Sequence, residues 1–486
     1  MLVTTETPFL LFSGTDCNTG KIKGGFGCLR RSEELNVMKF SFRLIVIFLV
    51  AFTFLATSAF GDNSRESDSQ LWKVGERRWT VQEEYNYSKW VETNITEEFF
   101  IRHEMRVDCA DVPYALRWIY ARINHLPAAA RTVDNRLIGH WSTDWKHLPT
   151  DEQWEKDRRF RTALLYMIYR TSTRTLPFDT YPIHIAADSV TAGTIFLIAG
   201  DHAGIVCRLV TDGSAAHPIQ TLEANLPTRI QKMLLRNFMF LPPGRDRVSG
   251  FVRFRWPIKT GNGWHYLPVK EYPFYSEEQY SSAFAKGYAD YFEAVEKRID
   301  PKIYDPHDKA EKIINTLARR LNERIPIVLD GHKKCHEIKC SEGSRFWEIY
   351  TTTDRDEFIG VMIDHLEEII GKNHLDRNVI LDKMARIRLQ ISPDRSVTLQ
   401  HVFQNFKWMS SDPGVTVEAR WGLDKCGMIA IHLKDARESI SFIQKKYGKT
   451  DPSFAERQTW SQQKIVDEMT RESRKNNCAA IASRQN

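Results

Sequence analysis

The sequence predicts an α+β fold in which one helix packs on an antiparallel sheet and a mostly helical region follows. Apolar residues recur every three or four positions over residues 109–124, which is the spacing of one face of a helix. Short apolar runs separated by Gly- and Asp-containing turns fill residues 194–256, as in strands joined by hairpins. Beyond residue 270, helical patterns interrupted by Asp-Pro pairs prevail.

Residues 38–61 have the three parts of a secretory signal peptide: a short basic segment, an unbroken apolar run at 44–56, and small residues after it. The apolar run is short for a transmembrane helix, which needs about 20 residues. An uncleaved N-terminal anchor is the alternative interpretation. We expect cleavage after Ala59 or Gly61, and we interpret residues 1–37 as an over-extended start.

Length, composition and charge limit the classes of partner. The mature chain, about 425 of the 486 residues, is long enough for two or three domains of roughly 150 residues each. The formal charge of +6 falls to about +4 without residues 1–61, and basic and acidic residues are interspersed. We therefore expect no nucleic-acid partner. We also expect export to the periplasm or medium of a bacterium, with membrane contact only through the signal peptide before cleavage.

The first expected domain spans residues 71–258 and contains the helix at 109–124, with Asp108 as its N-cap. Residues 131–180 are expected to form an insertion with a helix near 160–170. Four strands are expected to follow, at residues 194–199, 202–210, 217–225 and 250–256.

The second expected region, residues 270–470, is mostly helical. Its helices are expected within residues 276–325, 356–370 and 380–389. The charged tail after Asp451 is expected to fray. No motif in this region indicates a function.

Six cysteines belong to the mature chain: Cys109, Cys207, Cys335, Cys340, Cys426 and Cys478. Export to an oxidising compartment permits disulfides, and Cys335 with Cys340 could close a small loop. Free thiols are one alternative, and half of a zinc site with His332 and His336 is another. A structural zinc site ordinarily has a second Cys or His pair, which the sequence does not show, so a disulfide is favoured.

Cys109 and His202, each at the expected start of a helix or strand, are the candidate nucleophile and general base. A cysteine attacks only as a thiolate, and the pKa of an ordinary thiol, about 8.5, must be lowered for this. The amino end of a helix and a nearby imidazolium both stabilise a thiolate. The negative charge of Asp108 would oppose this unless its carboxylate caps the helix. Either residue alone fits a buried structural role, so the pair and its order carry the prediction.

The pair resembles the active-site pattern of the NlpC-type cell-wall peptidases and the related CHAP amidases, both papain-like. The matching residues are Asp-Cys-Ala-Asp at 108–111 and His-Ala-Gly-Ile-Val at 202–206. The Pro-Gly-Asp turn of those families is replaced by Ala-Gly-Thr at 192–194, and the stretch between the two motifs requires an insertion. Over about residues 105–255, the resemblance implies a papain-like Cys/His hydrolase of peptide or amide bonds, commonly in peptidoglycan.

A general base needs a third group that holds its ring, and we expect Glu223 or Asn225 in that role. If the two strands pair across the Thr-Asp-Gly turn, His202 lies opposite Asn225, and Glu223 is its diagonal neighbour on the same face. A register shift of two residues would exchange their roles. His217 would lie roughly 26 Å back along the hairpin, too far to contact His202. The resemblance allows either kind of orienting residue, because NlpC-type enzymes often use a second histidine, whereas CHAP relatives use a Glu or Asn. The alternative is that both are ordinary strand-end polar residues.

The sequence therefore predicts a secreted thiol hydrolase that acts on peptidoglycan or another peptide substrate, with no cofactor and no metal. Two alternatives stay open. One is an inactive papain-like module that binds cell wall or a partner protein, and the other is a transglutaminase-like acyl transferase. Fast alkylation of one cysteine at about pH 6 would separate an active site from an inactive module.

Overall fold

A computed structural model of the chain describes residues 69–237, 247–284, 288–342 and 344–478, which belong to one compact unit. The expected over-extended start (1–37) and signal peptide (38–61) lie outside the described residues. Within the described part of the chain, no helix combines the length and apolar character needed to cross a bilayer.

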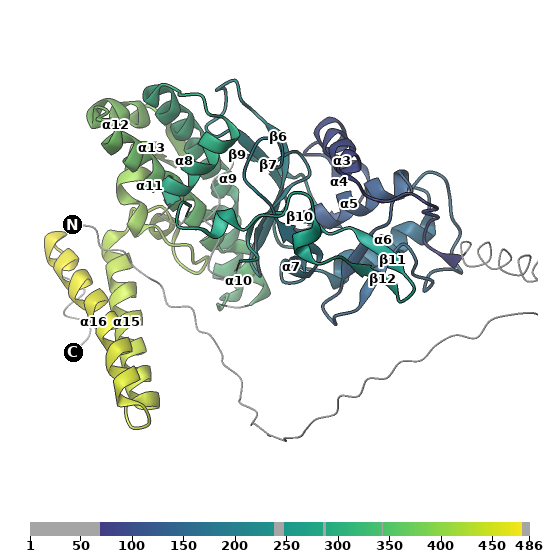
Figure 1. The fold of residues 1–486 in the computed structure, drawn as a ribbon. Helices are drawn as coiled ribbons and strands as arrows, with labels where there is room; N and C mark the ends of the chain where they lie inside the picture. Colours follow the sequence, from purple (N-terminus) through teal and green to yellow (C-terminus); the bar gives the residue numbers. More distant parts are fainter. Residues whose placement is uncertain (1–68, 238–246, 285–287, 343, 479–486) are drawn as a thin grey trace, which may run out of the picture. The chain divides into compact units, whose positions relative to one another are not determined.

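A six-stranded antiparallel sheet in the order β4-β10-β5-β6-β7-β9 lies at the centre of the fold (Figure 1). Its strands are β4 (Thr180–Pro182), β5 (Ile195–Ile198), β6 (His202–Leu209), β7 (Ile219–Glu223), β9 (Leu234–Asn237) and β10 (Gly250–Phe254). The four expected strands are the four inner ones. The edge strands β4 and β9 were not expected, because such short segments show too little alternation to stand out.

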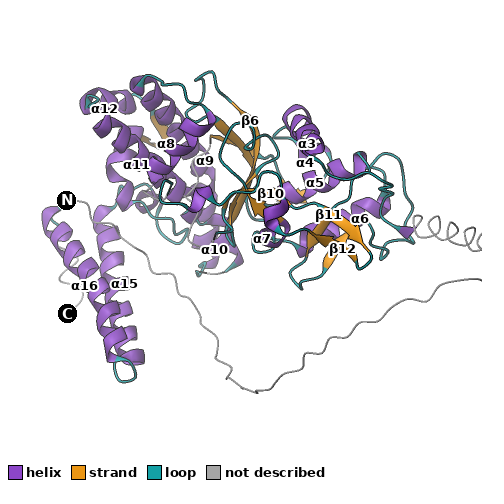
Figure 2. Cartoon of the chain, in the orientation of Figure 1, coloured by secondary structure: helices purple, strands orange, loops and turns teal. Residues whose placement is uncertain are grey.

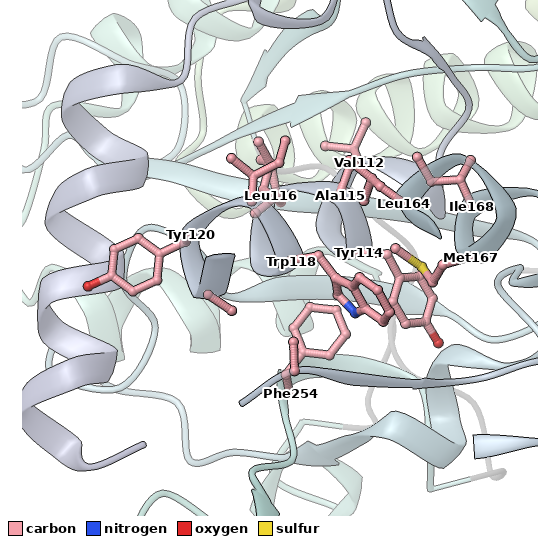
Figure 3. Packing of buried hydrophobic residues seen from close by; sticks show 14 of the residues in the cluster. Val112, Tyr114, Ala115, Leu116, Trp118, Tyr120, Leu164, Met167, Ile168 and Phe254 are labelled. Atoms are coloured by element: carbon pink, nitrogen blue, oxygen red, sulfur yellow. The ribbon is translucent and has the colours of Figure 1, made fainter. Parts of the chain in front are cut away.

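One face of the sheet is covered by three helices: α3 (Val81–Asn94), α5 (Asp111–Ile123) and α6 (Arg158–Arg170). The expected apolar stripe of α5 is fully buried at Val112, Leu116 and Ile119, but Ile123, at its end, is 43% exposed. Figure 3 shows side chains of α5 packed among those of α6 and Phe254 of β10. Because α5 is buried on all sides from Asp111 to Arg122, the stripe is only one part of its buried surface.

A buried ion cluster ties α3, α5 and β10 together. The carboxylate of Glu84 accepts hydrogen bonds from Arg117 at 2.5 and 3.1 Å, from Arg253 at 3.3 Å and from the Trp256 indole at 2.6 Å. The Arg117 guanidinium also stacks 3.2 Å from the ring centroid of Trp79. Because the buried carboxylate has several cationic and polar partners, its ionised form is compensated and α5 is held firmly on the sheet.

The opposite face of the sheet is covered by the C-terminal helices α8 (Tyr288–Ile299), α9 (Pro306–Ile338) and α11 (Thr353–Lys372), as Figure 2 shows. Phe196, Val206 and Phe251 of the sheet share one buried core with Leu317 of α9 and Met362 of α11. The mostly helical region thus supplies the third layer of an α+β sandwich. This confirms the expected α+β class, with an antiparallel sheet and a helical C-terminal region.

The remaining elements are short. They are α4 (Phe99–Arg102), β1 (Arg106–Val107), β2 (Ala129–Arg131), β3 (Leu137–Gly139), α7 (Leu176–Asp179), β8 (Arg229–Ile230), β11 (Pro257–Thr260), β12 (Gly263–Tyr266), α10 (Arg345–Tyr350), α12 (Arg377–Ala385), β13 (Arg388–Ser392), β14 (Arg395–Thr398), α13 (Leu399–Asn405) and α14 (Val417–Arg420). The expected helix at 380–389 is wrong at its end, where β13 starts and pairs with β14.

The described chain from Pro452 to Cys478 does not fray, contrary to expectation. Helix α15 (Lys425–Tyr447) and helix α16 (Pro452–Lys475) form an antiparallel hairpin, and a disulfide joins Cys426 to Cys478 at its base. Asp451 caps α16 by accepting a hydrogen bond from the Phe454 amide at 3.0 Å. The sequence pattern alone could not show this, because the pairing of two polar helices is a tertiary event.

Cys335 and Cys340 form a disulfide, which was the favoured interpretation of that pair. Among the described residues, no group of three or more His, Cys, Asp or Glu side chains is arranged to hold a metal ion.

Candidate active site

Cys109 lies just before α5 and not within it. The helix begins at Asp111 after an N-cap at Ala110, so the expected helix start at Cys109 is two residues too early. Asp108 is not the N-cap either. Instead the Asp111 carboxylate accepts a hydrogen bond from the Asp108 amide at 2.9 Å, and the Asp108 carboxylate accepts one from the Thr228 hydroxyl at 2.7 Å. Burial, followed by the charge of Asp108, raises the pKa of Asp111 to about 8.

The segment before Cys109 is tied to the loop after β7. Strand β1 pairs with β8 through Arg106–Ile230 and Val107–Arg229. The Gln231 amide donates to the carbonyls of both Val107 and Asn225 at 2.7 Å. These contacts bring the cysteine to the end of the sheet where β6 begins and β7 ends.

His202 opens β6 at this same end. Gly200 in the preceding turn has φ +83°, a left-handed conformation that glycine adopts without strain. The carbonyl oxygen of Asp201 lies 4.0 Å from the Cys109 sulfur. The His202 Nε2 atom lies 3.3 Å from Oε2 of Glu223, and the exposed side-chain fractions are 13% and 4%. Cys109 is also buried, so the three groups form a largely enclosed set.

The strand register explains why Glu223 reaches His202. Ile205 pairs with Leu222 and Val206 with Thr221, as expected, and a bulge at Cys207 shifts the pairs nearer the turn by one residue. Glu223 therefore stays on the His202 face, diagonal to it. The Thr221 hydroxyl donates to its other carboxylate oxygen, Oε1, at 2.7 Å. Both oxygens of the carboxylate are thus engaged.

The electrostatics of the set favour a protonated histidine. Burial by itself would lower the pKa of His202, but its hydrogen bonds with Cys109 and Glu223, and their negative charges, raise it to about 10. Burial by itself would raise the pKa of Glu223, but its hydrogen bond with His202 and the charges of His202, Arg236 and Arg320 lower it to about 2. An imidazolium between a thiol and a carboxylate is the arrangement that stabilises a thiolate.

The other candidates for the orienting residue lie elsewhere. Asn225 follows β7, and its backbone carbonyl bonds to Gln231, whereas the carboxylate on His202 is that of Glu223. His217 precedes β7 at its far end, where its Nδ1 accepts from the Ile219 amide at 3.2 Å and its ring packs on Phe292.

Cys207, the second free thiol among the described residues, belongs to the core beneath α5. Its sulfur lies 3.4 Å from the Gln220 carbonyl oxygen, and burial raises the pKa of its thiol to about 11. It therefore serves as a buried reference for the reactivity of Cys109.

The sequence reasoning missed several residues around Glu223 and His202. The Phe358 ring of α11 lies 6.2 Å from the His202 ring, edge to face. Arg236 of β9 has its Nε 4.0 Å from Glu223 Oε2, and it pairs with Glu323 of α9. Arg320 of α9 is buried beside them. The sequence offered little signal for them: Thr316, Arg320 and Glu323 recur at helical spacing, but Lys309 and Lys312 on the same face make it resemble an ordinary polar face.

No family model, curated protein or solved structure matches this chain. The functional argument therefore depends on the geometry of the site.

Proposed function

We propose that the protein is a thiol hydrolase that cleaves peptide or amide bonds, with Cys109 as nucleophile, His202 as general acid and base, and Glu223 as the residue that orients His202. The observation that carries this proposal is the contact of the His202 ring with Glu223 on one side and Cys109 on the other, within an enclosed set. Glu223 holds the ring at Nε2, and the hydrogen bond of the ring with Cys109 is the route by which a proton moves between thiol and imidazole.

The residues support a two-step reaction. The Cys109 thiolate attacks the carbonyl carbon, and the bond to nitrogen breaks as the His202 imidazolium protonates the leaving amine, which gives a thioester. Neutral His202 then takes a proton from water, whose oxygen attacks the thioester. The thioester bond breaks, and the products are a carboxylic acid and the restored thiolate–imidazolium pair. The amino end of α5 adds a favourable field for negative charge at the sulfur.

The proposed substrate is peptidoglycan or another peptide, as the resemblance to cell-wall hydrolases suggests. Purified peptidoglycan incubated with the protein should release new amino and carboxyl ends, identified by mass spectrometry of the soluble fragments. Cys109→Ala should lower this release at least about 1,000-fold, whereas Cys207→Ala should retain it and cost about 1 kcal/mol of stability. Full activity of Cys109→Ala would refute the proposal, and transfer of the acyl group to an added amine would indicate an acyl transferase.

A further inference from the structure

We propose that Arg320, on a helix outside the expected catalytic domain, is a positioning residue that acts together with Arg236 to keep Glu223 ionised against His202. The inference rests on the proposed function, since it concerns the same site. It assigns a role to the helical region, which the sequence left without one.

The helix α9 crosses the edge strand β9 beside the site. The Asn237 side chain donates to the Thr316 hydroxyl at 3.2 Å, and Arg236 forms an ion pair with Glu323. Thr316, Arg320 and Glu323 are spaced by four and three residues, so they lie on one face of the helix. That face therefore meets β9 and, through Arg236, the carboxylate of Glu223.

Arg320 is buried close to Phe358, which packs on His202. Its guanidinium lies 5.7 Å from the centroid of the Phe358 ring. Its Nε makes no hydrogen bond within the described residues. Burial, followed by the positive charge of Arg236, lowers the pKa of Arg320 to about 9, and the negative charges of Glu223 and Glu323 offset part of this. A buried guanidinium is costly unless negative charge compensates it, and these two carboxylates supply that charge.

The charges that face Glu223 come from three elements. His202 approaches from β6, Arg236 from β9, and Arg320 with Glu323 from α9. Cys109 lies beyond His202. With Arg320 present, the carboxylate can stay ionised despite burial, and the ionised carboxylate in turn holds the histidine as an imidazolium beside the thiol. Removal of a positive charge here should make every nearby proton harder to remove.

The test is the pH dependence of Cys109 alkylation by iodoacetamide in the full chain, followed by mass spectrometry of the Cys109 peptide, with Cys207 as internal reference. Arg320→Met should raise the pH of half-maximal alkylation by about one unit. Arg320→Lys should keep the wild-type profile because it keeps the charge. Arg319→Met, on the exposed side of the same helix, is the matched control and should leave the profile unchanged.

Glu323→Gln should shift the half-maximal pH of alkylation in the opposite direction. This variant is also more certain to fold, because the Glu323 side chain is 31% exposed. It removes a negative charge beside Arg236, so the half-maximal pH should fall. Unchanged profiles for Arg320→Met or for Glu323→Gln would overturn the inference, as would equal shifts for Arg320→Met and Arg319→Met. A different result would refute the proposed function itself: wild-type Cys109 would then react no faster than Cys207 below about pH 7.

Discussion

At the scale of single residues, the chemistry depends on how Glu223 is held. A carboxylate buried beside an imidazole fixes both the tautomer and the plane of the ring. Here the Thr221 hydroxyl holds one oxygen and His202 contacts the other. The backbone turn at Gly200 and Asp201 then sets where the ring points relative to Cys109.

Glu223→Gln should lower the rate of the chemical step about 100-fold, because the amide can hold the ring but cannot stabilise the imidazolium as a carboxylate does. Asn225→Ala and His217→Ala should each change this rate less than about threefold. Single-turnover measurements on these three variants, with substrate in limiting amount, separate chemistry from product release. A His217→Ala variant slower than Glu223→Gln would assign the orienting role to the histidine instead.

The same pair should make stability depend on pH in two windows. The pKa of Glu223 is lowered to about 2, so its stabilising contribution is present above the ordinary carboxylate pKa of about 4.3 and is lost as pH falls towards 2. The pKa of His202 is raised to about 10, so its contribution is present below about 6.5 and is lost as pH rises towards 10.

The pair therefore predicts maximal stability at about pH 4.5 to 6.5. Urea unfolding from pH 3 to 9 would measure the free energy of unfolding of the wild type and of Glu223→Gln. The variant should show shallower slopes on both sides. Parallel curves for the two proteins would show that other groups dominate the pH dependence.

At the scale of elements, the two long C-terminal helices depend on each other. The hairpin of α15 and α16 buries a small core that includes Met428, Leu433 and Met469, and the disulfide closes a separation of 52 residues. A cross-link over a loop of this length stabilises by up to about 4 kcal/mol, since it restricts the unfolded chain.

Replacing both Cys426 and Cys478 by Ser should therefore speed amide exchange in α15 and α16 while the sheet stays protected. The alkylation profile of Cys109 should not change, because the hairpin does not contribute the residues described around the site. Hydrogen exchange read by mass spectrometry checks both expectations. Equal loss of protection in the hairpin and in β6 would show that the hairpin supports the whole fold.

At the scale of the whole molecule, the helical region shares a buried core with the sheet. Phe196, Val206 and Phe251 are fully buried, in one core with the helices that follow residue 287. Burial of each such side chain contributes roughly 2 kcal/mol. For the three side chains this is about 6 kcal/mol, comparable with the roughly 5–15 kcal/mol that stabilises a typical domain.

A chain that ends at residue 275 should therefore fail to fold, although it contains all three proposed active-site residues. We expect it to aggregate or to lack a near-ultraviolet circular dichroism signal, and to show no fast-reacting cysteine. Sedimentation and circular dichroism would measure this against the full chain. A soluble, cooperatively unfolding fragment with a reactive Cys109 would show instead that the first region is independent.

Local sequence patterns were enough to predict the four inner strands, most of the apolar face of α5 and the pairing of β6 with β7 near the site. They also supplied the candidates Cys109, His202, Glu223 and Asn225. These depend on local periodicity and on the fixed geometry of a hairpin, which neighbouring residues specify. Two further features depend on how distant segments pack. Glu223 and not Asn225 contacts His202, and Arg236, Arg320 and Phe358 surround this pair. Periodicity shows that a face is to be buried, but the choice of the surface that covers it depends on packing between segments distant in the chain.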